Sequence, residues 1–217
     1  MFRLWERWGV TLGALGVAIW VIGVLVVSDS PSSTDSDATI QAWYASSSNQ
    51  NSEIAAYFLF AAGALCVIGF FGALRERLAD AEDSPARISQ LAFGAGLLSI
   101  ALMLLAVIMF VAPASAAAET SAADVVPATY RVLQNMGYMT LVAGTIIGAI
   151  AVWSSSAIAL RTGVFPRWFA WLGVLAGVVQ LGAVFFFPII LYCLWILVAS
   201  VLLTVRRTDS PVPVEVR

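Results

Sequence analysis

Six long apolar runs in this chain contain no Asp, Glu, Lys or Arg. They cover residues 9–27, 54–74, 88–112, 133–158, 168–186 and 188–205. Roughly 20 helical residues cross a hydrocarbon layer about 30 Å thick, because each residue adds about 1.5 Å. Backbone polar groups in lipid must be satisfied within their own segment, which selects helices. The sequence therefore predicts an all-α polytopic membrane protein, a six-transmembrane-helix bundle forming one integral membrane domain over residues 1–217.

The residue types that cofactors and metals need are scarce in this chain. Of its 217 residues 61% are hydrophobic and only 11% are charged, whereas about a quarter are charged in a typical soluble domain. There is no His, and both cysteines, Cys66 and Cys193, lie inside predicted spans. A disulfide framework, a haem with His ligands and a Cys/His metal site are therefore excluded. We expect no cofactor and no metal.

The positions of the arginines predict the orientation, since the chain has no Lys. Every arginine except Arg131 lies beside a terminus or on alternate connections between the runs: Arg3, Arg7, Arg75, Arg77, Arg87, Arg161, Arg167, Arg206, Arg207 and Arg217. The other connections carry Asp29, Asp35, Asp37, Glu53, Glu119 and Asp124. By the positive-inside rule, both termini are cytoplasmic and these acidic loops are outer. The net charge of −2 gives no reason to expect a nucleic-acid partner.

The first two outer loops each carry the pattern of a short helix. In the first, Asp37 precedes Ile40, Trp43 and Tyr44, whose spacing places them on one helical face. In the second, Thr120 or Ser121 is a candidate start, with Asp124 in the first turn. We favour a helix lying at the membrane interface or on the bundle rim for the first loop. The alternative is a lid over an outward cavity.

Small residues and turn residues predict how the helices pack and end. Stripes of glycine let helices approach closely in lipid, and the glycines concerned are Gly9, Gly13, Gly16, Gly23, Gly144, Gly148, Gly173 and Gly177. We favour packing within one chain over a homodimer face. Gly163 and Pro166 predict an inner turn, Pro188 predicts a tight hairpin between the last two spans, and residues 83–85 precede the third span as a turn.

Three segments give the chain a resemblance to a known family. They are Leu74-Arg75-Glu76-Arg77-Leu78, the run from Leu160 to Trp168 with Trp171-Leu172-Gly173, and Ile40 with Trp43-Tyr44-Ala45. Across nearly its whole length the chain resembles bacterial, often actinobacterial, multi-span membrane proteins catalogued as a domain of unknown function. The resemblance implies this architecture and a bacterial inner (plasma) membrane location. It implies no catalytic residue.

Polar side chains near the outer ends of the spans are the only candidates for a site. The candidate residues are Glu53, Tyr57, Arg131, Gln134, Asn135, Tyr138 and Gln180. They are candidates for an outward-facing polar cleft, in which an ion pair between Arg131 and Glu53 would explain the single outer arginine. We favour the alternative that these residues form interhelical hydrogen bonds, worth about 0.6–2 kcal/mol each. The spans carry no acidic or basic residue of the kind that coupled transporters place at membrane depth.

Two functions fit this pattern better than an enzyme. The first is a non-catalytic membrane protein acting through protein or lipid contacts, as an accessory or scaffolding subunit. Its partners would be membrane lipids, another membrane protein or further copies of itself. The second is a channel or carrier for a small neutral or hydrophobic solute, in which Asn135→Leu or Gln180→Leu would abolish flux. A membrane enzyme using Glu53, Arg131 and Tyr57 ranks third, so we predict no catalytic residue.

Overall fold

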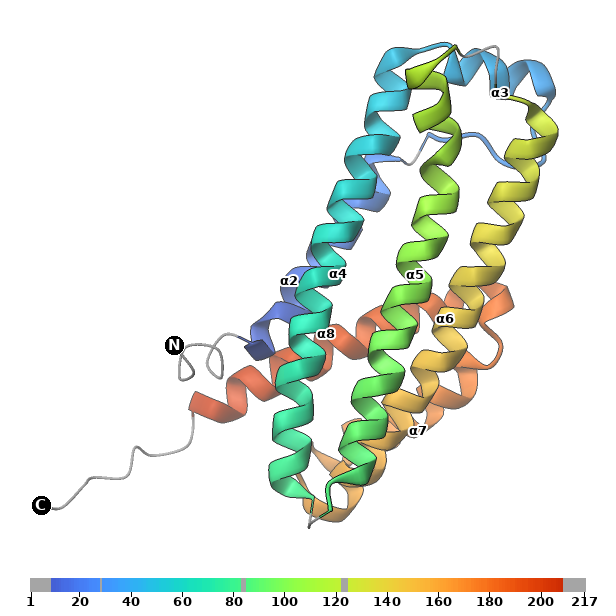
Figure 1. Ribbon diagram of the computed structural model, residues 1–217. Coiled ribbons are helices and arrows are strands. Elements are labelled where there is room, and N and C mark those ends of the chain that lie inside the picture. The colour runs from blue at the N-terminus through green and yellow to red at the C-terminus, as the bar shows by residue number, and fades with distance from the viewer. Residues whose placement is uncertain (1–8, 28, 83–84, 122–124, 209–217) are drawn as a thin grey trace, which may run out of the picture.

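The chain folds into helices only, as predicted, within the part that the structure describes. The computed structural model describes residues 9–27, 29–82, 85–121 and 125–208 (Figure 1). The elements are η1 (Gly9–Thr11), α2 (Leu12–Val26), α3 (Asp37–Tyr44), α4 (Ser47–Ala81), α5 (Arg87–Glu119), α6 (Pro127–Thr162), α7 (Arg167–Gln180), η3 (Ala183–Phe185) and α8 (Phe187–Thr208). No strand occurs in these ranges.

Three long helices, α4, α5 and α6, stand side by side and form the body of the bundle (Figure 1). They contain 35, 33 and 36 residues. At 1.5 Å per residue each is about 50 Å long, well beyond a hydrocarbon layer of about 30 Å. α2 packs on α4, α7 packs on α6, and α8 contacts α2, α6 and α7. We call the two ends of this body the α3 end and the arginine end, the latter at the α4–α5 and α6–α7 turns.

The fifth predicted span differs from the structure. Five helices are long and apolar enough to cross a membrane, and α7 is not one of them in the described chain. α7 has 14 residues, about 21 Å, and ends at Gln180. Leu181 and Gly182 close a tight turn, in which the Gly182 amide donates to the Val179 carbonyl at 2.9 Å. η3 and Phe186, with a positive φ of 61°, then lead into α8. The predicted tight hairpin is therefore a longer link, although Pro188 does lie in the first turn of α8.

Glycines bring neighbouring helices into close contact within this one chain, as predicted. A Cβ on Gly16 of α2 would lie 2.7 Å from the Gly63 carbonyl oxygen of α4, and one on Gly63 would lie 2.9 Å from the Gly16 carbonyl oxygen. A Cβ on Gly144 would likewise lie against the Ser99 carbonyl oxygen of α5, and one on Gly148 would lie against Tyr192 of α8. These contacts hold the main core, which lies between the long helices.

Ser200 joins the beginning of α2 to α8. Its hydroxyl donates to the Val10 carbonyl and accepts from the Ala14 amide, with 3.0 Å between the amide nitrogen and Oγ. Val10 and Ala14 are the pair that would bond directly in a regular α-helix. The inserted hydroxyl accounts for the 3₁₀ turn η1 at this point. The contact holds α2 and α8 together at the arginine end.

The turns at the arginine end follow local sequence chemistry. Gly163 has a φ of 75° and ends α6 in the left-handed conformation, as predicted, and α7 begins directly after Pro166. Glu82 caps α5: its carboxylate accepts from the amides of Ile88 and Ser89, both at 2.9 Å. The sequence predicts this turn at residues 83–85, of which residues 83 and 84 lie outside the described chain.

The cap at Glu82 predicts a pH dependence of stability. Slight burial raises the pKa of Glu82, but the hydrogen bonds from Ile88 and Ser89 outweigh it, so the pKa is lowered overall. A lowered pKa stabilises the fold above the unfolded value of about 4.3, and this contribution is lost as the pH falls through the folded pKa. We expect Glu82→Gln to cost about 0.3–1 kcal/mol at pH 7 and nothing near pH 2. Melting curves in detergent from pH 7 to pH 2, with Glu76→Gln as control, measure this difference. An equal cost at both pH values would contradict it.

Of the two predicted short outer helices, one is confirmed and one is wrong. α3 forms where predicted, although its cap is Ser36 rather than Asp37, since the Ser36 side chain accepts from the Thr39 amide at 3.2 Å. The second does not form: α5 continues through Pro113 to Glu119, and Thr120 is its C-terminal cap. Ala114 and Ala117 pack into a buried cluster at the α3 end, and this packing extends α5. Asp124 lies outside the described residues.

Candidate functional site

A second, smaller core lies at the α3 end, apart from the main core. It consists of Ile40 and Tyr44 of α3, Ala114 and Ala117 of α5, and Val125 and Tyr130 beside and in α6, and we call it the α3 cluster. The rings of Tyr44 and Tyr130 meet edge to face with 5.8 Å between their centroids. The Tyr130 hydroxyl donates to the Pro31 carbonyl. The α3 cluster therefore fixes both α3 and the loop before it over the ends of α5 and α6.

Arg131 binds this same loop and pairs with Asp37, not with Glu53 as the polar-cleft alternative required. Its Nη2 lies 2.6 Å from Asp37 Oδ1 and 2.8 Å from the Asp35 carbonyl oxygen, and its Nε donates to the Ser33 carbonyl at 3.0 Å. The guanidinium group therefore meets two backbone carbonyls and one carboxylate. Arg131 is an anchor for the α2–α3 loop.

Glu53 is buried and is bound by neutral donors. Its side chain is 7% exposed. Ser30 donates to Oε1 at 3.0 Å, and the Tyr44 hydroxyl donates to Oε2 at 3.1 Å. Burial, and then the proximity of Glu53, raises the pKa of Tyr44 far above its usual value. Tyr44 therefore stays protonated and remains a donor. Among the arginines whose side chains the structure describes, none forms an ion pair with Glu53.

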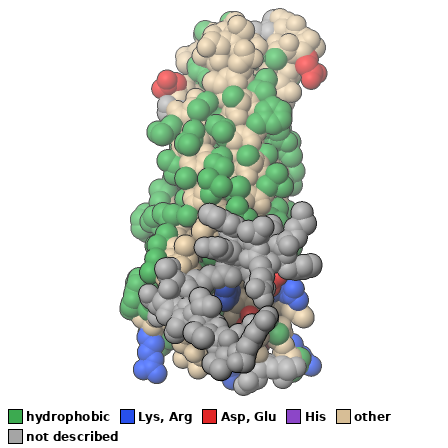
Figure 2. All heavy atoms as spheres, turned by 90° about the vertical axis from the view of Figure 1, so that its left-hand side faces the viewer, with side chains coloured by type: hydrophobic (Ala, Val, Ile, Leu, Met, Phe, Trp, Pro, Cys, Tyr) green, Lys and Arg blue, Asp and Glu red, His purple; other side chains and the backbone are tan. Residues whose placement is uncertain are grey.

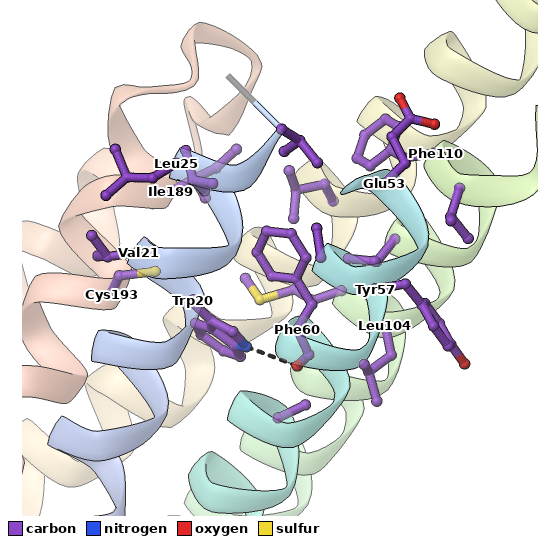
Figure 3. Close-up of a pocket in the computed structure, with 18 of the residues that line it drawn as sticks. Trp20, Val21, Leu25, Glu53, Tyr57, Phe60, Leu104, Phe110, Ile189 and Cys193 are labelled. Atoms are coloured by element: carbon purple, nitrogen blue, oxygen red, sulfur yellow. Dashed lines mark hydrogen bonds between the residues drawn. The ribbon is translucent and has the colours of Figure 1, made fainter. Parts of the chain in front are cut away.

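A cavity of about 560 Å³ lies between α2, α4, α5, α6 and α8, on the α3 side of the bundle (Figure 3). Most of its wall is apolar and includes Trp20, Phe60, Met103, Val107, Phe110 and Ile189. Trp20 reaches toward α4 and donates its indole N–H to the Phe60 carbonyl at 3.0 Å (Figure 3). Ser30, Glu53, Tyr57 and Gln134 border the cavity toward the α3 end, but almost all of the surface that faces the cavity is apolar. The cavity is therefore an apolar site.

The cavity opens between the ends of α2 and α8. Val24 and Leu25 of α2 line it and are 56% and 68% exposed. Phe186 and Ile190, at the start of α8, line the other side and are also exposed. At the arginine end the same two helices are joined through Ser200. The opening is therefore bordered by apolar side chains from two candidate spans.

The structure brings together only part of the predicted polar set. Glu53, Tyr57 and Gln134 line the cavity, whereas Asn135 is exposed outside its wall. Tyr138 donates to the Val184 carbonyl at 2.7 Å and so ties α6 to η3. Gln180 is fully buried, and neither side-chain polar atom has a protein partner. Asn135→Leu and Gln180→Leu therefore alter residues outside the cavity wall, and neither tests this site.

The sequence alone does not distinguish the residues of the apolar wall from other apolar residues of the spans. Trp20, Phe60 and Phe110 have the composition of any span, so their role depends on which face of each helix is turned inward. Chemically, the cavity offers apolar contact along its wall. In the described residues no group of three or more His, Cys, Asp or Glu is placed to hold a metal ion. Cys66 and Cys193 are both free thiols.

Comparison with known proteins gives one match. The family model described as a domain of unknown function, DUF4386, matches residues 9–206. No curated protein matches significantly. No solved structure matches significantly either. Since the matched residues include every described helix except the last turn of α8, the chain belongs to the DUF4386 family of domains of unknown function.

Proposed function

We propose that this protein is a non-catalytic membrane protein that binds a hydrophobic molecule, a membrane lipid or a solute of similar character, in the cavity between α2, α4, α5 and α8. The observation that carries the proposal is the cavity itself. Its volume of about 560 Å³ lies within the roughly 300–1,000 Å³ usual for small-molecule sites. Its wall is apolar, so contact with an apolar ligand provides the binding energy.

The ligand enters from the bilayer through the opening between α2 and α8. Leu25 and Ile190 on its two edges are exposed and apolar, as lipid-facing residues are. A molecule dissolved in the membrane reaches such an opening without crossing water. Carriage of the ligand between the membrane and another acceptor is the second candidate function, and the lateral opening is the observation that favours it.

The location we propose is a bacterial plasma membrane, with the arginine end in the cytoplasm. Figure 2 shows hydrophobic side chains covering the middle of one face, with acidic groups near the upper end and arginines, together with some acidic groups, near the lower end. Arg75, Arg87 and Arg161 lie at the arginine end, and Asp35 and Asp37 lie at the α3 end. The positive-inside rule orients such a protein with the arginine end inward. The cavity then faces the outer leaflet.

Blocking the cavity tests this function directly. We expect Val107→Trp to reduce binding of an uncharged fluorescent alkyl probe at least about tenfold, because the larger side chain occupies the volume that the probe needs. The matched control is Ile108→Trp, on the adjacent residue of α5, which is 46% exposed and outside the wall. Native mass spectrometry of both variants, extracted gently from membranes, compares the lipid that each retains.

The two variants separate the possible outcomes. Loss of probe and lipid from Val107→Trp alone, at an unchanged melting temperature, supports the site. Equal retention by both variants contradicts it. A stoichiometric second protein in the same spectra, with no lipid in the cavity of either variant, would favour an accessory subunit acting through protein contacts instead.

A further inference from the structure

Glu53, Tyr57 and Trp20 border the cavity but direct no free polar group into it. Ser30 and Tyr44 donate to the two carboxylate oxygens of Glu53. The carboxylate of Glu53 and the hydroxyl of Tyr57 point away from the cavity (Figure 3). The indole N–H of Trp20 is bound to a backbone carbonyl of α4. A polar group of a ligand would therefore be buried here without a partner among these residues, which is costly.

The cavity has a buried end and an open end. Val17, Ala64 and Met103 line the buried end, and we call these three residues the floor, since all of them belong to the main core. At the opening between α2 and α8, Leu25 and Ile190 are 68% and 46% exposed. Along α2, the floor and the opening are separated by about 12 Å, at 1.5 Å per residue. The cavity is thus elongated, and its wall passes from the core to the lipid-facing surface.

We infer that the cavity holds a hydrocarbon chain inserted end-first, with its methyl end on the floor and any polar head left at the opening between α2 and α8. The inference rests on the proposed function and specifies which part of the ligand is bound. Each buried CH₂ group strengthens binding through the hydrophobic effect, whereas a hydroxyl on the floor weakens it. A membrane lipid and a free hydrocarbon are the two sources of such a chain.

The test compares three ligands of equal chain length: dodecane, dodecanol, and dodecanediol with a hydroxyl at each end. Each displaces an uncharged fluorescent alkyl probe from the purified protein in a neutral detergent, at equal mole fraction in the micelle. We expect dodecane and dodecanol to bind equally, because dodecanol keeps its hydroxyl at the opening. Dodecanediol should bind at least about tenfold more weakly, since insertion from either end buries a hydroxyl on the floor.

Each other result has a definite meaning. Dodecanediol that binds as tightly as dodecanol overturns the inference, because the floor would then accept a polar group. Dodecanol that binds as weakly as dodecanediol also overturns it, because the whole ligand would then be enclosed. Failure of the wild type to bind the probe or any of the three ligands overturns the proposed function itself.

A variant of the floor assigns the preference to the buried end. Met103→Gln places an amide there, so we expect it to bind dodecanediol more tightly, relative to dodecanol, than the wild type does. The matched control is Leu105→Gln, on the same helix, which is 42% exposed and outside the wall. It should keep the wild-type preference. An unchanged preference in Met103→Gln, at a wild-type melting temperature, overturns the position of the methyl end.

Photolabelling of the wild type measures the same orientation without any variant. A dodecanol that carries a diazirine at its methyl end should crosslink to the floor. Crosslinks confined to Leu25 and Ile190 at the opening would overturn the inference.

Competition with this photolabel identifies the source of the chain. Excess phosphatidylglycerol added to the micelles should block labelling of the floor if the chain belongs to a lipid. Blocking by dodecane alone assigns a free hydrocarbon, and blocking by neither overturns the inference.

Discussion

Gly16→Val should lower the melting temperature of the protein by several degrees. A Cβ at this position would lie 2.7 Å from the Gly63 carbonyl oxygen and 2.7 Å from Cγ2 of Val67. The first of these atoms belongs to the backbone of α4, so no side-chain rotation relieves the overlap. Overpacking of this kind costs about 1–3 kcal/mol, and about 2–4 °C per kcal/mol is expected for a chain of this size.

Gly94→Val is the matched control, because a Cβ on Gly94 meets nothing within 4 Å. It makes the same chemical change within helix α5, where glycine is itself a weak helix former. We expect its melting temperature, measured in detergent by intrinsic fluorescence, to stay near or above that of the wild type. Equal melting temperatures for the two variants would mean that α2 and α4 do not meet at Gly16 and Gly63.

The membrane-crossing parts of the fold were predictable because lipid imposes a strong rule. Charged residues are excluded from the hydrocarbon layer, so charge-free runs mark the spans. The same rule does not predict where a helix begins or ends outside the hydrocarbon layer. α4 begins at Ser47 and α6 at Pro127, several residues before the apolar runs that predicted them. The extension of α6 contributes Tyr130 to the α3 cluster, and Gln50 in the extension of α4 donates to the Tyr44 carbonyl of α3. Hydropathy cannot detect either contact.

The end of α7 shows a second limit of hydropathy. Residues 168–186 contain no charged residue and are apolar except for Gln180, so the run is predicted as one span. Apolar composition, however, does not distinguish a helix from a turn buried in apolar surroundings. Here the chain turns after Gln180, and Gly182 and Phe186 take the turn conformations. Glycine at position 182 was the one local signal, and a single glycine within a span is too common to predict a break.

The candidate site was predictable in its polar residues and not in their partners. Glu53, Tyr57 and Gln134 were chosen for their position near the outer ends of spans, and the cavity wall includes all three. The partner of Arg131 depends on how the α2–α3 loop folds back, because Asp37 lies 94 residues away in the chain. Several acids compete for one arginine, and only the three-dimensional path of the loop decides among them.

Tyr130→Ala should detach α3 and its preceding loop while leaving the bundle folded. Tyr130 is 1% exposed, packs its ring on Tyr44 and donates its hydroxyl to the Pro31 carbonyl. Truncating a buried aromatic residue to Ala costs about 3–5 kcal/mol. α3 has only eight residues, too few to persist as a helix without this packing. The substitution therefore destabilises the loop and α3, which open locally before the long helices do.

Hydrogen exchange followed by mass spectrometry measures this opening peptide by peptide. In Tyr130→Ala we expect faster exchange for peptides covering residues 29–46, with α7 and α8 unchanged. Val132→Ala, two residues along α6 and 55% exposed, should exchange as the wild type does. Because Ser30 of this segment lines the cavity, opening of the segment should also release the cavity ligand faster. Unchanged exchange over residues 29–46 would mean that Arg131, rather than the α3 cluster, holds the loop in place.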